Sequence, residues 1–552
     1  MAGEPTTPGG YDARMTGSPN VFYVTTPIYY VNDKPHLGHV YTTMIADVVA
    51  RYHRLRGDDV FFLTGVDEHA AKVADKAAEQ GLTPQQWADR NAAAFREVFE
   101  KLEMTNDDFV RTSEDRHKVK VTEYVAALLK SGDVYEGEYE GWYDAGQEEY
   151  VPENKAKASD YKSEVNGKPL VRKSEKNYFF RLSKYVPDLL EHFRGNPTFV
   201  QPDARRNEIV NRIKDAQDVP ISRSGAGGWG IPIPGDPSQT IYVWIDALFN
   251  YLSYIDTPER RHYWQSGATH FIAKDILWFH ASIWPAMLMA LRKCPGYDWV
   301  NLPRMIYSHS YWVSESGQKM SKSLGNFLDP QAIDNYVKEF GLDALRYFLA
   351  TRGPLGTTDS AFSPDLFAEV YNSDLANTFG NSCSRVTNMI GKYFEGKLNH
   401  RGAEDTEIKP DPESPTTWPQ HITQIVAEYV DYGDRLCLDA EGDAGLRIVE
   451  TVDLSIEKWQ PFKLAKDRAN LPQVEQILGN CLEALRIASV LLWPFIPDAC
   501  ELFWERIGCD YAAQMKKNGG RGKLDEWVKW GQLKPGQRIE TGTALFPRYQ
   551  VK

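Results

Sequence analysis

The fold is set by the stretch Val21-Phe22-Tyr23-Val24-Thr25-Thr26 and, nine residues later, His36-Leu37-Gly38-His39. The first segment is apolar and rich in residues that favour strands, which predicts a buried strand. The residues after it keep helical spacing as far as Gly57, a typical helix stop. The apolar positions of this period are Leu37, Val40, Tyr41, Met44, Ile45, Val48, Val49 and Tyr52. We therefore expect both histidines on the first turn of a helix that leaves a strand.

A helix start of this kind is suited to bind phosphate. Its free backbone N–H groups and the positive end of its dipole attract anions. The imidazoles of His36 and His39 can add hydrogen bonds, and Gly38 lets a nucleotide approach the backbone without a Cβ in the way. The alternative is a chance pair of solvated or core histidines.

A second segment, Lys319-Met320-Ser321-Lys322-Ser323, points to the same chemistry. It follows the polar, Gly-containing stretch 314–318, which predicts a surface loop. Lys319 and Lys322 are three residues apart, so they can converge on one polyphosphate as two point charges. Alone, an ordinary loop with solvated lysines would be the simpler reading. Together, the two segments predict the formation of an adenylate from ATP.

The two segments are similar to the signatures of the class I aminoacyl-tRNA synthetases, written HIGH and KMSKS. Here they stand as HLGH and KMSKS. Within that class the sequence resembles the methionyl-tRNA synthetase family, in order and approximate spacing along nearly the whole chain. The matching stretches are Thr26–Asn32, Phe62–His69, Tyr242–Ala247, Lys274–Ile276 with Phe279–His280, and Leu324–Asn326. The resemblance implies ATP-dependent activation of L-methionine and its transfer to tRNA(Met) with a CAU anticodon.

The pattern of strands and helices divides the chain into four parts. Strands and helices alternate from Val21 and again from Ile241, which predicts an α/β fold with a Rossmann-type doubly wound parallel sheet. An inserted β-rich module with a basic surface lies between, and long helical periods after Ser363 predict an α-helical bundle. With the roles that the resemblance implies, the parts are a disordered N-terminal tail (1–20), a catalytic domain (21–131 and 240–362), a connective-peptide insertion without zinc (132–239) and an anticodon-binding helical domain (363–552). We expect weak order in the last thirty residues.

Composition is that of an ordinary globular enzyme. The 552 residues carry a net charge of −13, which excludes a generally basic coat for nucleic acid but allows a local basic stripe. The six cysteines form no C-x-x-C pair and none lies in 132–239, so neither a disulfide framework nor a structural zinc is predicted. The first twenty residues resemble no signal or transit peptide, and no stretch approaches the roughly 20 apolar residues of a membrane span. We expect a cytoplasmic monomer that has no contact with a membrane.

For the nucleotide, the resemblance implies that His36 and His39 hold the phosphates and that Lys319 and Lys322 close on the leaving pyrophosphate. These four are the expected catalytic residues, and Mg²⁺ is expected to accompany ATP. Alanine replaces the usual glycine at position 273, which adds a methyl group close to the ribose site. The full set of expected ATP-binding residues is His36, Gly38, His39, Asp275, Lys319 and Lys322.

For methionine, the resemblance implies an apolar slot and a carboxylate that pairs with the α-ammonium group. Asp67 is the candidate carboxylate, and its alternative role is to cap the following helix. An aromatic slot suits the polarizable sulfur of methionine, whereas ordinary core packing is nearly as good an account of Ile276 and Leu248. Ala70 stands where the family commonly has glycine. The expected methionine-binding residues are Ile28, Tyr30, Asp67, Trp244, Ala247, Leu248, Tyr251, Ile276, Phe279 and His280.

For the anticodon, the resemblance implies Asn381, Arg385 and Phe462. The first two are four residues apart and therefore share a helix face, where their amide and guanidinium groups can pair with base edges. The alternative is a solvated helix face, and Trp459 competes with Phe462 as the stacking platform. Two other functions remain open: a non-catalytic tRNA-binding scaffold, which intact HLGH and KMSKS segments disfavour, and a class I synthetase for another amino acid. The short insertion disfavours isoleucine, valine and leucine, whose enzymes carry a large editing insert.

Overall fold

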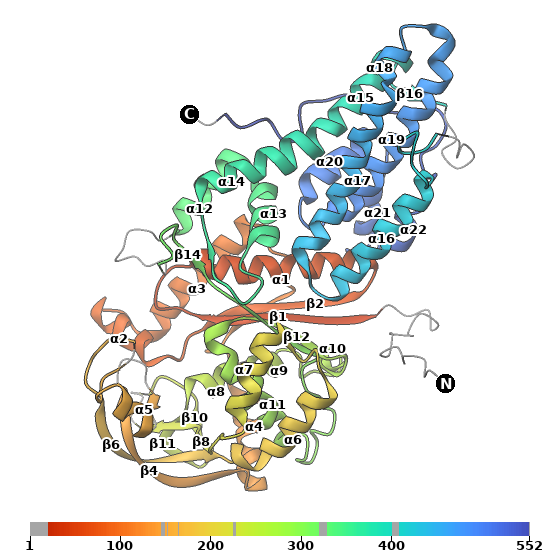
Figure 1. The fold of residues 1–552 in the computed structure, drawn as a ribbon. Helices are drawn as coiled ribbons and strands as arrows, with labels where there is room; N and C mark the ends of the chain where they lie inside the picture. The colour runs from red at the N-terminus through yellow and green to blue at the C-terminus, as the bar shows by residue number, and fades with distance from the viewer. Residues whose placement is uncertain are drawn as a thin grey trace.

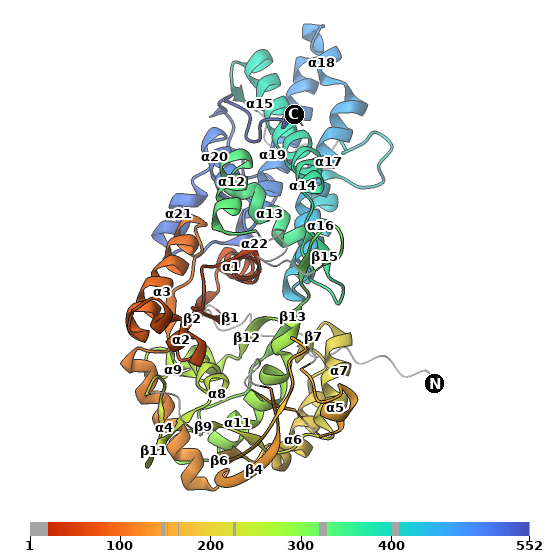
Figure 2. The ribbon, with the colours of Figure 1, turned by 90° about the vertical axis from the view of Figure 1, so that its left-hand side faces the viewer.

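The computed structural model describes residues 20–144, 149–151, 153–163, 165–224, 228–318, 328–399 and 408–550. It has three tiers (Figures 1 and 2): small antiparallel sheets at one end, a parallel sheet with helices in the middle, and a helical bundle at the other end. The expected N-terminal tail and the KMSKS segment lie outside the described residues, except for Asn20.

The middle tier is built on a six-stranded sheet in which every pair of neighbours is parallel. The strand order is β3-β2-β1-β12-β13-β7. The strands are β1 (Val21–Tyr30), β2 (Asp59–Asp67), β3 (Asp108–Arg111), β7 (Val200–Gln201), β12 (Ala268–Ala273) and β13 (Met305–His309). The order reverses direction between β1 and β12, which is the switch point where doubly wound sheets bind ligands. The predicted doubly wound sheet is confirmed.

Alternate residues of β1 point to opposite faces of the sheet, as the period of a strand requires. Phe22 and Val24 belong to one hydrophobic cluster, which includes α1 (Leu37–Arg56) and α13 (Leu342–Arg352) and continues into the helical bundle. Tyr23 belongs to the other, which includes α3 (Pro84–Lys101), α4 (Asp115–Ser131) and α11 (Trp284–Leu291). The bundle therefore shares a core with one face of the sheet.

The expected insertion (132–239) is not wholly separate from the central sheet. Strand β7 lies in this range and pairs with β13 at the sheet edge. It was missed because a two-residue edge strand followed by Pro202 carries no periodic signal. The remaining strands form two small sheets, β5-β4-β6-β8 and β10-β11-β9. Their bounds are β4 Val134–Asp144, β5 Glu149–Val151, β6 Val171–Phe180, β8 Val219–Pro220, β9 Ser222–Ser224, β10 Pro232–Ile233 and β11 Asp236–Ile241.

The tip of the insertion is held by an aromatic contact. Trp142 near the end of β4 lies against Tyr161, with ring centroids 4.5 Å apart, and its indole N–H donates to Glu153 Oε2 at 2.8 Å. Among the described residues, no group of three or more His, Cys, Asp or Glu side chains could hold a metal. The lack of a structural zinc stays a prediction, which metal analysis of the purified protein can test.

The C-terminal part is helical. Its main helices are α14 (Pro364–Val370), α15 (Asn381–Phe394), α16 (Trp418–Asp434), α17 (Leu438–Trp459), α18 (Pro461–Leu464), α19 (Leu471–Leu492) and α20 (Pro497–Arg506). The last thirty residues are packed rather than weakly ordered up to Gln550. Glu483, buried in α19, accepts hydrogen bonds from the backbone N–H groups of Gly531 and Gln532 at 2.8 and 2.9 Å, and Phe546 is buried. No described helix is long and apolar enough to span a membrane.

Candidate active site

A cavity of about 420 Å³ opens at the carboxyl ends of β1, β2, β12 and β13, beside the switch point of the sheet. Loops that follow parallel strands gather there, so residues far apart in the sequence meet. Of the expected nucleotide and methionine residues that the structure describes, all but Phe279 line this cavity. They are Ile28, Tyr30, His36, Gly38, His39, Asp67, Trp244, Ala247, Leu248, Tyr251, Asp275, Ile276 and His280.

The HLGH segment forms the first turn of α1, as predicted. His36 is the N-cap: its Nδ1 accepts the backbone N–H of Gly38 at 3.0 Å, and its own N–H donates to Nδ1 of His39 at 3.2 Å. A Cβ on residue 38 would lie 2.9 Å from Cε1 of His36, so alanine would displace the ring that caps the helix. The cap therefore disfavours a side chain at position 38.

The caps also set the protonation of the two rings. A nitrogen that accepts a backbone N–H carries no proton, so Nδ1 of each ring is unprotonated and a ring proton can only be on Nε2. Burial, together with the neighbouring His36, lowers the pKa of His39 well below its usual value, so His39 is neutral at physiological pH. The first turn thus offers N–H donors from the side chains in addition to those of the helix start, which is a suitable arrangement for phosphate oxygens.

One side of the cavity, where the ribose is expected, follows β12. Ala273 and Asp275 line the wall. The neighbouring Lys274 is turned to Asp359, with Nζ 2.6 Å from Oδ1, and the same oxygen accepts the backbone N–H of Tyr311 at 2.9 Å. These contacts fix the segment after β12 against the segment after β13, and so hold the loop that carries Asp275.

An aromatic slot forms the opposite part of the cavity. The ring of Trp244 stacks on Phe279, with centroids 4.4 Å apart and an interplanar angle of 12°. Phe279 thus backs the slot rather than lining it. Tyr251 Oη lies 2.8 Å from Nε2 of His280, whose Nδ1 lies 3.0 Å from the carbonyl oxygen of Ile276. Burial lowers the pKa of His280 to about 4, so the neutral ring donates from Nδ1 and accepts the hydroxyl hydrogen of Tyr251.

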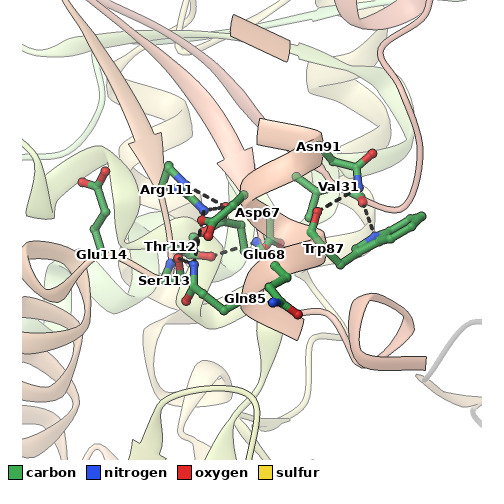
Figure 3. Close-up of polar contacts among 12 residues, drawn as sticks. Val31, Asp67, Glu68, Gln85, Trp87, Asn91, Arg111, Thr112, Ser113 and Glu114 are labelled. Carbon is green, nitrogen blue, oxygen red and sulfur yellow. Dashed lines mark hydrogen bonds and ion pairs between the residues drawn. The ribbon is translucent and has the colours of Figure 1, made fainter. Parts of the chain in front are cut away.

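Asp67 ends β2 at the floor of the cavity and is buried. Burial, followed by the nearby charge of Asp246, raises the pKa of Asp67 well above its usual value. Behind it, Glu68 accepts from Arg111 and from Ser113 (Figure 3). Figure 3 also shows Trp87 of α3, whose indole N–H donates to the carbonyl oxygen of Val31 at 2.9 Å, just after β1. The two strand ends that frame the cavity are therefore braced from outside.

Several residues of the cavity were not anticipated from the sequence. His309 ends β13, and its Nε2 lies 2.8 Å from Oγ1 of Thr42 on α1. The rule that ligands gather at the carboxyl ends of parallel strands could have identified the residues at the end of β13 and after it. The lining residues that the sequence did not indicate are Pro27, Tyr29, Leu37, Tyr41, Thr42, His309, Ser310, Tyr311, Trp312 and Leu328.

The expected anticodon residues lie in the helical bundle, away from the cavity. Lys319 and Lys322 lie outside the described residues. In the helical bundle, Asn381 begins α15 and is exposed, and Arg385 Nη1 lies 3.9 Å from Asp453 Oδ1. The exposed fraction of Phe462 is 39%, whereas Trp459 is partly buried and its indole N–H donates to the carbonyl oxygen of Lys409 at 3.0 Å. Of the two candidate stacking platforms, Phe462 is the more accessible.

A switch-point cavity walled by an HLGH turn is the architecture of a class I aminoacyl-tRNA synthetase. Consistently, the model of the family "tRNA synthetases class I (M)" matches residues 22–160 and 155–387. The chain belongs to the methionyl-tRNA synthetase family.

Individual relatives match over nearly the full length of this chain. The chain is 37% identical to methionine–tRNA ligase of Halalkalibacterium halodurans, over 98% of this chain and 80% of that protein. It is 39% identical to methionine–tRNA ligase of Streptomyces coelicolor, over 96% and 97%. Among solved structures, Mycobacterium tuberculosis methionyl-tRNA synthetase in complex with methionyl-adenylate has a TM-score of 0.83 and 31% identity, over 96% of this chain and 100% of that one. The similarity therefore extends through catalytic and helical parts alike.

Proposed function

We propose that this protein activates L-methionine with ATP and transfers the methionyl group to the 3′-terminal adenosine of tRNA(Met) with a CAU anticodon. The observation that carries the proposal is that the HLGH turn, the aromatic slot and Asp67 line one cavity. A phosphate site and an amino-acid site in one cavity bring the reacting carboxylate and the α-phosphate together. The relatives named above carry this activity in their names.

The reaction needs alignment and stabilisation of charge more than a protein nucleophile. The methionine carboxylate attacks the α-phosphate of ATP in line, and pyrophosphate leaves. In this proposal the first turn of α1, with His36 and His39, donates hydrogen bonds to the phosphates. Lys319 and Lys322 neutralise the charge that develops on the leaving pyrophosphate.

Mg²⁺ belongs to the proposal as a companion of ATP. This ion is held in such sites chiefly by substrate phosphates and water, with one or two carboxylates at most. Asp275 is a cavity-lining carboxylate near the expected ribose and fits a contact of that limited kind. When bound, Mg²⁺ would neutralise phosphate charge, and the protein's own donors would orient the nucleotide.

Recognition of methionine rests on the slot and the floor of the cavity. Trp244, Tyr30 and Tyr251 present aromatic surface, and sulfur makes favourable contacts with ring edges. Asp67 would pair with the α-ammonium group. A longer or branched side chain would meet Trp244, which its stack on Phe279 holds in place.

We assign tRNA binding to the other two tiers. Asn381, Arg385 and Phe462 present an amide, a guanidinium and a partly exposed ring on neighbouring helices, a set suited to unstacked bases. The exposed lysines of the insertion, such as Lys157 and Lys176, are suited to the acceptor end. The proposal places the protein in the cytoplasm, because all six cysteines are unpaired, as in a reducing compartment. It also includes a monomeric state.

Amino-acid-dependent ATP–pyrophosphate exchange across all twenty amino acids is the direct test. We expect exchange with methionine alone, and charging of a CAU tRNA in the same preparation. Exchange with another amino acid would identify a different synthetase. Binding of tRNA with no exchange at all would identify a non-catalytic scaffold.

A further inference from the structure

Three carboxylates meet behind the floor of the cavity: Asp67, Glu68 and Asp246, each at most 2% exposed. Two of them are fully matched by donors. Glu68 accepts from Arg111, with Nε at 2.8 Å and Nη2 at 2.7 Å from Oε1, and from the backbone N–H of Ser113 at 3.2 Å (Figure 3). Its charge is balanced by a guanidinium in direct contact.

Asp246 on α8 (Val243–Leu248) is held by two histidines. His69 Nδ1 lies 2.7 Å from Oδ2, His117 Nε2 lies 2.8 Å from Oδ1, and Ser253 Oγ lies 2.7 Å from the other nitrogen of His117. Burial alone would raise the pKa of Asp246, but His69 and His117 lower it to about 2. Asp246 is therefore an ionised carboxylate inside the protein.

Asp67 has weaker partners. The backbone N–H of His69 is 3.4 Å from Oδ1, and the hydroxyl of Thr112, which accepts the N–H of Glu68 at 2.9 Å, is left to donate to Asp67. No ion pair among the described residues includes Asp67, in contrast to Glu68 with Arg111. The ring of His69 thus contacts the ionised carboxylate of Asp246, and the backbone N–H of His69 contacts Asp67, which has no cation as a partner.

Every element packed around Asp67 contributes to its electrostatic environment. Two negative charges lie near Asp67. That of Glu68 is balanced by Arg111, and that of Asp246 is held by N–H groups of histidines. The charged and titratable groups are Glu68 and His69 after β2, Arg111 of β3, His117 of α4 and Asp246 of α8. Two unbalanced buried charges in contact with the same histidine would be costly.

We propose that Asp67 holds a proton in the empty site because it is buried without a cation and ionised Asp246 lies nearby, and that the α-ammonium group of the substrate displaces this proton. The inference rests on the proposed role of Asp67 in binding that group. On binding, the O–H bond of the Asp67 carboxyl breaks, its proton passes to water, and the ammonium N–H groups donate to the carboxylate. The ammonium then supplies the positive charge that the pair of carboxylates lacks.

A consequence is selectivity for amino acids over acids without the amino group. A ligand without an ammonium leaves the proton on Asp67 and gains no ion pair. Affinity for a cationic ligand should rise with pH while the empty site is protonated, by at most a factor of ten per pH unit. The sign follows because Asp67 binds its proton more tightly without the ligand than with it.

Calorimetry on the full chain tests this with two probes. L-Methioninol keeps the ammonium and lacks the carboxylate, whereas 4-(methylthio)butanoate keeps the carboxylate and lacks the ammonium. Titrations in two buffers of different ionisation enthalpy, between about pH 5 and pH 8, count the protons released. We expect up to one proton per methioninol and none with the acid.

Variants locate the source of the proton. Asp67→Asn should bind methioninol with no proton release and roughly ten- to a hundredfold more weakly. Asp246→Asn should reduce proton release at neutral pH, because it removes the neighbouring charge that adds to burial in holding the proton on Asp67. The matched control is Asp115→Asn, which removes the same charge from a side chain that is 90% exposed on α4.

Infrared difference spectroscopy provides a measurement that does not depend on the Asp246 variant. Addition of methioninol to the wild type should remove the carbonyl band of a protonated carboxylic acid, and Asp67→Asn should lack this change. Methioninol binding without proton release at any pH, in a protein with normal exchange, would overturn the inference and leave the proposed function intact. Unchanged methioninol affinity in Asp67→Asn would overturn the assignment of Asp67 itself.

Discussion

Gly433 is expected to be indispensable where the helical bundle meets the HLGH helix. Tyr52, about four turns of α1 beyond the HLGH turn, lies against α16, and its hydroxyl donates to the carbonyl oxygen of Val430 at 3.2 Å. A Cβ on residue 433 would lie 2.5 Å from Cε2 and 2.7 Å from Oη of Tyr52. Both atoms belong to a buried ring on a long helix, so neither side can yield cheaply.

The expected effect of Gly433→Ala is a net loss of about 1 to 3 kcal/mol in the free energy of unfolding. Overpacking of a buried site costs roughly 1 to 3 kcal/mol, and loss of the Tyr52 hydrogen bond costs about 1 kcal/mol more. The better helix propensity of alanine returns about 0.5 to 1 kcal/mol. Gly195→Ala is the matched control, because that residue ends α6 (Leu182–Gly195) and a Cβ there would meet nothing within 4 Å.

Urea unfolding gives the stability, and a comparison of pyrophosphate exchange with tRNA charging gives the functional effect. We expect charging to fall more than exchange, because the substitution disturbs the junction of the two parts and not the cavity. In the double variant Tyr52→Val/Gly433→Ala the two substitutions should be strongly non-additive, since the smaller side chain removes the clash. A Gly433→Ala protein as stable as Gly195→Ala would refute this account of the junction.

Three further predictions concern the site, the anticodon and pH. Lys322→Ala should lower pyrophosphate exchange by orders of magnitude with nearly unchanged methionine binding, since the lysine acts on the leaving group in the transition state; a normal exchange rate would exclude that role. Arg385→Ala should reduce charging of a CAU tRNA roughly tenfold to a hundredfold while exchange survives, and equal losses in both assays would show that Arg385 supports the fold instead. Burial raises the pKa of Glu441 to about 8, so its stabilising protonated form is lost as pH rises through that value. Glu441→Gln should flatten the decline in stability between about pH 5 and pH 8, and thermal unfolding across this range gives the comparison.

The convergence of the site residues could be predicted because it follows from strand ends. His36, Asp67, Trp244 and Asp275 lie far apart in the sequence, yet each follows a strand or a helix start that the pattern of residues locates. Parallel strands then bring them to one edge of the sheet. The two motifs predicted which residues act in the site, and the alternation of strands and helices predicted where in the fold these residues lie.

What escaped prediction depends on tertiary contacts rather than on local pattern. The apparently weak C-terminal segment is fixed by a buried ion pair of α19: Arg486 Nη2 lies 2.6 Å from Glu483 Oε1, and the pair bonds to backbone groups of residues 527–533. Irregular backbone of this kind has no period to detect, because partners from a distant helix satisfy its polar groups. The edge strand β7 was missed for the related reason that two residues are too few to show a period.

The α/β part and the helical part meet over charged side chains that are buried at the sheet face. Asp47 and Arg51 pair on α1 at 2.8 Å, and Arg346 pairs with Asp343 on α13 at 3.0 Å. Asp343 also accepts the backbone N–H of Ala499 at 2.8 Å, in the first turn of α20. A carboxylate at a helix N-terminus satisfies donors that would otherwise be unpaired. Because these bonds are directional, they fix one orientation of the bundle against α1, and the proposed anticodon residues are thereby held at a fixed distance from the HLGH turn.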